Sequence, residues 1–276
     1  MKLEEVPGPI PESQMAREII KAHPEKLVKV LIHGRERIGK SIWAINVLWE
    51  VYEALQDLDE VKSHPVFERD TSEEKISIPD LVKTTDPEDE AYKRTFSQLY
   101  FKPELFLDAV DITESYIIEK GFDAQVPGMI LDDAGIGLGG GLYDYDRNTY
   151  WELRETWPTI GTYVTGLFLT TPEPEDITDQ FKGWSYRVKI LEEPTMGEKY
   201  GRRAAVYKED TDVIGVHRRA RREGGWKEDF SCFLPDKWFQ PYFRKRANFR
   251  KEVKEAREKR KEEKEKEHLK SDVEEA

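Results

Sequence analysis

The sequence has very little cysteine and no long apolar run. Its single cysteine, Cys232, excludes an internal disulfide and a zinc site built from several cysteines, so we expect a reducing compartment. No apolar stretch approaches the roughly 20 residues that a membrane-spanning helix needs. The first residues, MKLEEVPGPIPESQ, lack the basic and apolar segments of a secretion signal. We therefore expect a cytoplasmic protein that does not bind membranes.

Methionine is also scarce, whereas charged residues make up 36% of the chain. This lysine- and glutamate-rich balance is typical of proteins from hot environments. The net charge of −12 argues against a protein that coats nucleic acid with its whole surface, but it permits a local basic patch. The segment 217–227, HRRARREGGWK, is such a patch, and we expect it to contact DNA phosphates through Arg218, Arg219, Arg221 and Arg222. The alternative is that these arginines pair with acidic residues of the same chain.

The most informative stretch is 28–49, VKVLIHGRERIGKSIWAINVLW, which is an apolar strand, a loop and an amphipathic helix. Its loop matches G-x-x-x-x-G-K-[ST], in which glycines let the backbone wrap around phosphate oxygens and a lysine adds a full charge. A plain strand-to-helix turn does not require lysine and then serine at the helix start. We therefore predict a phosphate site formed by Gly34, Arg35, Glu36, Arg37, Ile38, Gly39, Lys40, Ser41 and Ile42.

Two later strands supply polar residues for the same site. The strand 126–133, VPGMILDD, ends in Asp132 and Asp133, and parallel sheets bind nucleotides at the carboxyl ends of their strands. We predict that Ser41 and Asp132 hold Mg²⁺ and that Asp133 polarises the attacking water; two acids that cap a turn are the alternative. The strand 163–171 ends in two threonines, and we predict that Thr171 or its neighbour Thr170 reaches the γ-phosphate. Simple strand termination would explain the threonines equally well.

Periodicity and turn residues outline the rest of the chain. Helices are expected at 14–22, 40–58, 103–119 and 149–157, and further strands at 95–101, 186–191 and 203–209. The acidic, proline-punctuated segment 61–94 is predicted to be a surface excursion. We divide the chain into an arm and short helix at 1–24, one domain at 25–243 and a charged tail at 244–276 that is either a solvated helix or disordered.

With these motifs in place, the chain resembles P-loop ATPases of the AAA/RecA-like branch, which carry an added strand between the phosphate-loop strand and the acidic strand. The LDDAG and LTTP segments are similar to those of small ATPases from archaeal viruses and plasmids, and of helicase loaders. The resemblance implies a three-layer α/β fold with a mostly parallel sheet, and ATP and Mg²⁺ as cofactors. It gives Lys40, Asp132 and Asp133 the roles stated above. It also implies a homo-oligomer in which a neighbouring subunit supplies an arginine, for which Arg147, Arg154 and Arg187 are the candidates.

Our leading interpretation is an Mg²⁺-dependent ATPase that acts on the DNA of a mobile element in loading, partition or packaging. The alternative is a nucleotide-gated interaction protein that hydrolyses ATP slowly and docks a partner through its charged tail and the acidic segment 61–94. A small-molecule kinase would need a lid of arginines over an acceptor pocket, and the acidic region 86–90 offers none.

Overall fold

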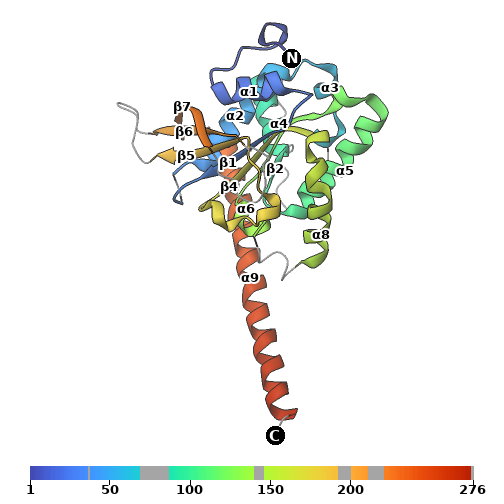
Figure 1. Ribbon diagram of the computed structural model, residues 1–276, viewed down its shortest axis with the longest axis vertical. Helices are drawn as coiled ribbons and strands as arrows, with labels where there is room; N and C mark the ends of the chain where they lie inside the picture. The colour runs from blue at the N-terminus through green and yellow to red at the C-terminus, as the bar shows by residue number, and fades with distance from the viewer. Residues whose placement is uncertain (37, 69–86, 140–145, 192–199, 211–220, 275–276) are drawn as a thin grey trace.

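A seven-stranded sheet runs through the centre of the protein (Figure 1). The computed structural model describes residues 1–36, 38–68, 87–139, 146–191, 200–210 and 221–274. The strands stand in the order β2-β3-β4-β1-β5-β6-β7. Their bounds are β1 Val28–His33, β2 Leu99–Tyr100, β3 Val126–Leu131, β4 Val164–Thr171, β5 Tyr186–Leu191, β6 Gly201–Asp210 and β7 Arg221–Ser231.

Strands β2, β3, β4, β1 and β5 are parallel, and β6 and β7 continue the sheet in antiparallel pairing. Every residue of β3 and β4 is buried, which requires cover on both faces of the sheet. Strand β4 lies between β1 and β3, so the carboxyl ends of all three strands meet at one edge. The predicted three-layer P-loop NTPase fold with an added strand is therefore confirmed.

The helices cover both faces of this sheet. Their bounds are α1 Gln14–Ala22, α2 Lys40–Leu55, α3 Asp59–Lys62, α4 Pro87–Ser97, α5 Pro103–Lys120, α6 Ala134–Gly137, α8 Arg147–Thr156 and α9 Asp236–Glu274. Short 3-10 turns occur at Leu3–Glu5, Pro65–Phe67, Phe122–Ala124, Trp157–Thr162, Pro174–Asp176 and Asp179–Phe181. Helix α1 begins where the sequence predicts, because the Ser13 side chain accepts the Ala16 N–H at 3.3 Å.

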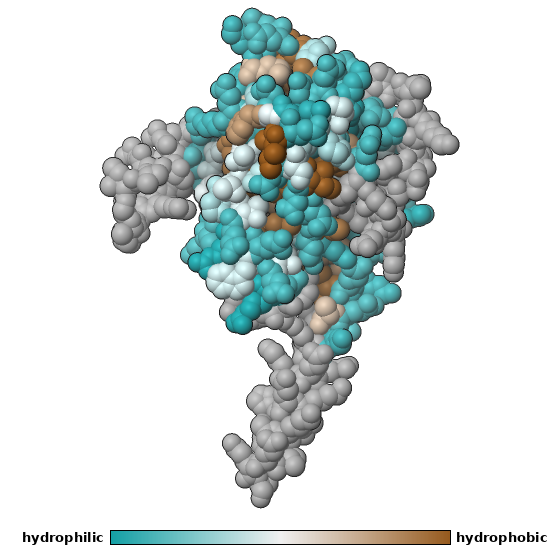
Figure 2. Space-filling model, turned by 90° about the vertical axis from the view of Figure 1, so that its right-hand side faces the viewer, coloured by the Kyte–Doolittle hydropathy of each residue, from teal (hydrophilic) through white to brown (hydrophobic). Residues whose placement is uncertain are grey.

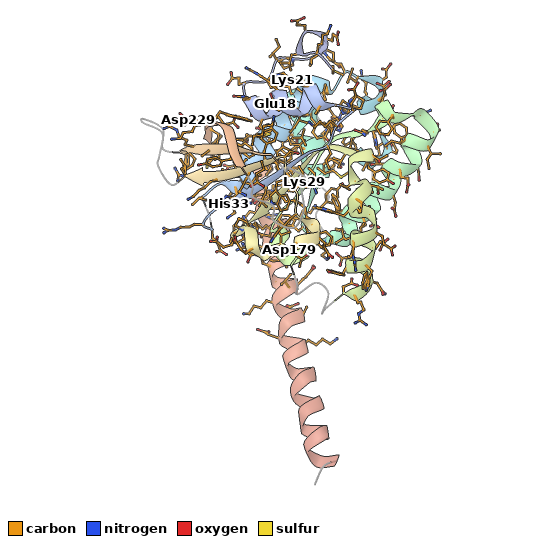
Figure 3. The ribbon with its side chains drawn as sticks, viewed as in Figure 1. Glu18, Lys21, Lys29, His33, Asp179 and Asp229 are labelled. Atoms are coloured by element: carbon orange, nitrogen blue, oxygen red, sulfur yellow. The ribbon has the colours of Figure 1, made fainter. Side chains whose placement is uncertain are left out.

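Helices α1 and α2 both contact β1 and β4, whereas α5 contacts β2 and β3 and is itself contacted by α8. The charged residue of β1, Lys29, which Figure 3 labels, is buried. Its Nζ lies 4.9 Å from the ring centroid of Trp157 and 5.9 Å from that of Trp184. Lys29 is therefore accommodated in the interior through its aliphatic stem and a cation–π contact of its ammonium group.

Two predictions for the region before α5 are wrong. The strand expected at 95–101 is only Leu99–Tyr100, because the residues before it belong to α4. The segment 61–94 is not purely a surface excursion, since Val61, Val66 and Tyr92 are buried. Tyr92 of α4 stacks on Trp49 of α2 with ring centroids 5.2 Å apart. Within α4 the buried apolar residues are Ala91, Tyr92 and Phe96, whose spacing places them on one side of the helix.

Helix α9 crosses the predicted boundary at 243 and 244 without interruption. It begins against the body of the protein and then projects away from it to the C-terminus (Figure 1). Trp238 near its start is fully buried and stacks on Phe96 and Tyr92 of α4, with ring centroids 5.5 Å away in both cases. The first turns of α9 are thus part of the packed structure rather than a solvated tail.

The surface shown in Figure 2 is mostly hydrophilic, and its apolar patches are small and interrupted by polar residues. Among the residues that the structure describes, no helix is long and apolar enough to cross a membrane.

Candidate active site

The loop between β1 and α2 has the backbone conformation that a phosphate site requires. Gly34 and Gly39 have φ angles of +136° and +100°, which side chains other than glycine rarely adopt. Gly39 also lies against Cys232, whose Sγ would be 2.4 Å from a Cβ placed there. The loop delivers the chain directly into α2, whose N-terminal N–H groups and positive dipole end favour an anion. Of the predicted phosphate-binding residues, Arg37 lies outside the described part of the chain.

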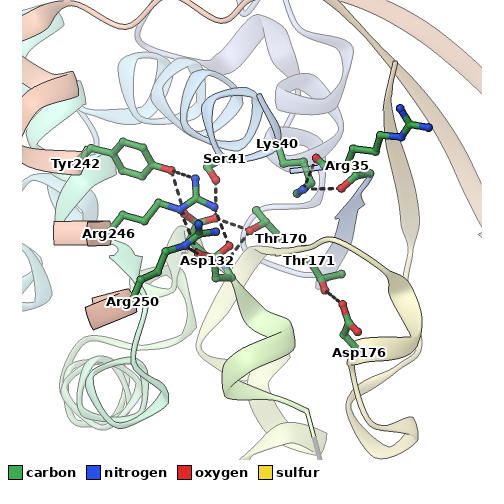
Figure 4. A network of polar contacts seen from close by, with 12 residues as sticks. Arg35, Lys40, Ser41, Asp132, Thr170, Thr171, Asp176, Tyr242, Arg246 and Arg250 are labelled. Carbon is green, nitrogen blue, oxygen red and sulfur yellow. Dashed lines mark hydrogen bonds and ion pairs between the residues drawn. The ribbon is translucent and has the colours of Figure 1, made fainter. Parts of the chain in front are cut away.

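Lys40, the first residue of α2, folds its side chain back over this loop. Its Nζ donates to the carbonyl oxygens of Gly34 and Arg35 at 2.6 and 2.8 Å (Figure 4). Burial lowers the pKa of Lys40, and the charges of Asp133 and Asp132 act in the opposite direction. The lysine is therefore positioned beside the loop interior, within the charge field of both predicted acids.

Ser41 and Asp132 lie in direct contact, as the sequence predicts for a shared metal site. The Ser41 hydroxyl donates to Asp132 Oδ1 at 2.6 Å, and both residues are buried. Asp132 also accepts hydrogen bonds from the hydroxyls of Thr170 and Tyr242, the latter at 3.2 Å. The Asp132 carboxylate and the three hydroxyls that contact it all present oxygen atoms. Oxygen is the ligand type that Mg²⁺ prefers.

No group of three or more histidine, cysteine, aspartate or glutamate side chains that could hold a metal ion occurs in the described ranges. This does not conflict with the predicted site, because Mg²⁺ at phosphate sites is usually bound through one or two carboxylates together with water and the phosphates of the substrate. The residues present therefore fit the ion.

Asp133 occupies a different environment from its neighbour. It follows β3 with φ of +51°, and its backbone N–H donates to Thr170 Oγ1 at 3.0 Å. Its carboxylate accepts two hydrogen bonds from Arg246, at 2.8 and 3.1 Å, and one from Arg250 at 3.3 Å (Figure 4). Burial by itself raises the pKa of this carboxyl, but the two arginines outweigh burial and lower it. Asp133 is thus a carboxylate whose two oxygens are both engaged.

The two threonines at the end of β4 point to different places. Thr170 contacts Asp132 and the backbone of Asp133, whereas the Thr171 hydroxyl donates to the Glu173 carbonyl at 3.0 Å and to Asp176 Oδ2 at 3.1 Å. Neighbouring residues of a strand lie on opposite faces, so only one of the two can face the phosphate loop. The structure brings Thr170 to the site and turns Thr171, the preferred choice from the sequence, away from it.

Sequence reasoning missed three residues of α9 that complete the network. Tyr242, Arg246 and Arg250 are spaced four residues apart, so they share one face of the helix. The Tyr242 hydroxyl reaches Asp132, and Arg246 Nη1 donates to that hydroxyl at 3.0 Å. Burial lowers the pKa of Arg246, but the charge of Asp132 and the contacts with Tyr242 and Asp133 outweigh it and raise the pKa. A usable signal existed in the aromatic residues Trp238, Tyr242 and Phe249, whose spacings of four and seven fit one helix face.

The arginines predicted to serve a neighbouring subunit are held elsewhere. Arg187 Nε lies 2.7 Å from Glu209 Oε1, and Arg154 lies over the Trp151 ring at 4.7 Å. Arg147 begins α8.

The basic patch is only partly within the described part of the chain. Arg218 and Arg219 lie outside it, and Arg221 and Arg222 open strand β7 rather than a loop. Trp226 is half-buried in that strand, where its Nε1 donates to Glu228 at 3.1 Å and its ring packs edge-on against Tyr186 at 5.5 Å. Trp226 therefore packs against its own sheet through both its ring and its Nε1.

Comparisons with known proteins give distant relatives. No protein-family model matches the chain. An uncharacterized protein, B-251 of Sulfolobus spindle-shape virus 1, is 24% identical over 247 residues, which is 87% of this chain and 82% of that protein. Two solved structures of the genome packaging NTPase B204 from Sulfolobus turreted icosahedral virus 2, in complex with AMPPCP and with ATP-gammaS, share 13% and 15% identity. They cover 67% of this chain and 93% of theirs, with TM-scores of 0.35 and 0.34. The similar proteins thus come from viruses of Sulfolobus.

Proposed function

We propose that this chain is an Mg²⁺-dependent ATPase that acts on the DNA of a mobile element. The observation that carries the hydrolysis part is the contact of 2.6 Å between Ser41 Oγ and Asp132 Oδ1, beside Lys40 at the start of α2. A strand-to-helix turn without a nucleotide would not need a lysine, a serine and a buried carboxylate to converge at one point. The loop glycines and the dipole of α2 supply the remaining contacts for phosphate oxygens.

Each residue of the site has a distinct task in this proposal. Lys40 binds the β- and γ-phosphates, and Thr170, in place of Thr171, contacts the γ-phosphate from the end of β4. Ser41 and Asp132 would hold Mg²⁺, which neutralises charge on the phosphate oxygens. Asp133 orients a water whose oxygen forms a bond to the γ-phosphorus as the bond from that phosphorus to the β,γ-bridging oxygen breaks. The water proton leaves through Asp133 to solvent.

Hydrolysis is tested by replacing Asp133 with asparagine, which keeps the shape and the Ser41–Asp132 contact. We expect ATP to bind and turnover to fall by about 10²- to 10⁴-fold, because the group that orients water is lost. Asp108→Asn, an exposed aspartate on α5, is the matched control and should behave as wild type. Wild-type turnover in the Asp133→Asn variant would remove this assignment.

The DNA part rests on the basic segment and on the virus context of the similar protein B-251. Phosphate contacts release counterions, so DNA affinity should fall with added salt, by about one unit of log–log slope for each contact. Replacing Arg218, Arg219, Arg221 and Arg222 with alanine should flatten that slope for single- or double-stranded DNA. Replacement of Lys21 and Lys62, exposed cations elsewhere on the surface, is the control. A slope that does not change in the quadruple variant places DNA binding elsewhere or nowhere.

A second candidate function is favoured by one observation. Both oxygens of Asp133 accept hydrogen bonds from Arg246 and Arg250, and these compete with a water for the same oxygens. If this arrangement persists when ATP is bound, the protein is a nucleotide-gated interaction module with slow hydrolysis. ATP turnover measured with and without DNA separates the two functions, since only the DNA-acting enzyme should be stimulated.

A further inference from the structure

Helix α9 is held against the site by contacts that do not involve the two acids. Trp238 packs on α4, and Phe101, which follows β2, contacts both Tyr242 and Phe249 with ring centroids 6.2 and 5.6 Å away. Lys245 Nζ donates to the Leu99 carbonyl at 3.1 Å. These contacts fix the first turns of α9 beside β2, so the Arg246 side chain enters the site from a firmly placed backbone.

The charges around the loop are arranged for a further anion. In Figure 4, Arg246 and Lys40 lie on opposite sides of Asp132. The Arg246 guanidinium approaches Asp132 Oδ2 at 3.9 Å while it holds Asp133. A guanidinium presents two parallel donors that match a phosphate as well as a carboxylate. The terminal phosphate of ATP, once bound at Lys40 and Ser41, would compete with Asp133 for the same donors. Loss of that partner would leave Asp133 Oδ1 available to water, while Arg250 still contacts Oδ2.

We propose that Arg246 is a catalytic residue that moves from Asp133 to the γ-phosphate when ATP binds. This inference rests on the proposed ATPase function and replaces the arginine that the sequence assigned to a neighbouring subunit with one from the same chain. The guanidinium stabilises charge that builds up on the γ-phosphoryl oxygens, and its departure from Asp133 frees Oδ1 of that carboxylate to orient water. Binding of the correct substrate thereby assembles the hydrolytic site.

The binding test uses nucleotides that differ only in the terminal phosphate. Affinities for ATPγS and ADP, both with Mg²⁺, are measured by titration calorimetry in Asp133→Asn and in Asp133→Asn with Arg246→Ala. Both proteins lack the buried carboxylate, so its unpaired charge cannot disturb the comparison. We expect the second change to weaken ATPγS by about 10- to 100-fold and ADP by less than about 2-fold, because only ATPγS has the contacted phosphate. Equal weakening of both nucleotides would overturn the proposal.

The turnover test uses the otherwise wild-type chain. Arg246→Ala should lower turnover by at least about 10³-fold, and Arg246→Lys should recover only part of the loss because it lacks the planar fork. Lys251→Ala, an exposed lysine of α9 that pairs with Glu255, is the control and should match wild type. Faster turnover in Arg246→Ala would show that the arginine is only a brake, and unchanged turnover would show that it has no part; either result overturns the proposal.

A mixing experiment identifies the chain that supplies the arginine. If Arg246 serves its own chain, a mixture of Lys40→Ala and Arg246→Ala proteins should remain inactive at every ratio. Turnover restored by mixing would mean that the arginine acts between subunits, which contradicts the proposal. The proposed function fails separately, namely if wild-type protein neither binds nor hydrolyses ATP.

Discussion

The candidate site combines residues from the edge of the sheet with residues from helix α9, and the two sets of side chains are positioned in different ways. The edge of the sheet contributes the loop, Ser41, Asp132, Asp133 and Thr170, which are positioned by backbone conformation and strand pairing. Helix α9 contributes Tyr242, Arg246 and Arg250, which are positioned by aromatic packing more than a hundred residues later in the chain. The groups at the sheet edge are therefore fixed by backbone conformation and strand pairing, whereas Arg246 and Arg250 depend on the packing of one helix against the body of the protein.

The largest expected effect lies on the sheet side. Lys40→Ala should weaken ATP binding by about 10²- to 10⁴-fold, because two charge-assisted hydrogen bonds are lost at roughly 1.5–3 kcal/mol each. Fluorescence titration with labelled ATP measures the change, and Lys62→Ala is the control for a surface lysine. Thermal unfolding should stay close to wild type. ATP affinity that survives this substitution would mean that the loop is not the phosphate site.

Substitutions that disturb the packing of α9 should lower the stability of the protein rather than its affinity for ATP. Trp238→Ala removes a fully buried indole and should lower the free energy of unfolding by about 3–5 kcal/mol. Urea unfolding measures the loss, and Trp238→Phe, which keeps a ring against Phe96, should lose less. A midpoint that does not move would show that α9 is an independent tail, and the contrast between the two regions would disappear.

On the sheet side, His23 makes the free energy of unfolding depend on pH. This residue lies at the end of α1. Its Nδ1 is 2.8 Å from Thr165 Oγ1 of β4, and burial, with a smaller effect of the N-terminal charge, lowers its pKa from 6.5 to about 4. The folded pKa is below the unfolded one, so folding favours the neutral ring. Its contribution is complete above pH 6.5 and is lost as the pH falls from 6.5 toward 4, by about 3 kcal/mol in all.

The measurement is the free energy of unfolding of wild type minus that of His23→Gln, followed from pH 7 to pH 4. The difference cancels other groups, such as Glu50, whose pKa is raised to about 6 mainly by burial and which therefore acts with the opposite sign. A difference that does not vary with pH would mean that His23 titrates normally in the folded protein.

The smallest effect is expected where α9 meets α5. Lys102 Nζ and Glu252 Oε2 are 2.7 Å apart, but both side chains are substantially exposed. Glu252→Gln should therefore change the free energy of unfolding by less than about 1 kcal/mol, and 1 M salt should abolish the difference. A larger loss would show that α9 is attached by charge rather than by Trp238 and its neighbours.

Much of the sheet side could be predicted from the sequence because its signals are local. The glycine spacing, the Lys40–Ser41 pair and the acids after an apolar run each occupy a few consecutive residues, and the structure brings them together. The choice between Thr170 and Thr171 could not be made, because it depends on which face of β4 meets the loop. The register of β4 with β1 and β3 decides which face that is. The sequence of β4 alone does not reveal this register.

The α9 side could not be predicted because its decisive residues are hidden among similar ones. Residues 244–276 hold 13 lysines and arginines, and nothing in a single sequence distinguishes Arg246 from the others. The division at 244 also separated Trp238 and Tyr242 from Phe249, which together form the packed face. Aromatic spacing across that division would have extended the helix, but only a tertiary contact reveals which acid it reaches.

The length of α9 determines how far its C-terminal end moves when the helix changes direction beside Asp133. The helix continues from Arg246 to Glu274, which is roughly 42 Å at 1.5 Å per residue, and projects away from the body. Pro241 removes one backbone hydrogen bond just before Tyr242, where the helix bends most easily. A tilt of about 10° at the arginine would sweep the far end through roughly 7 Å. A small change in the direction of α9 beside the site would thus appear as a displacement several times larger near Glu274.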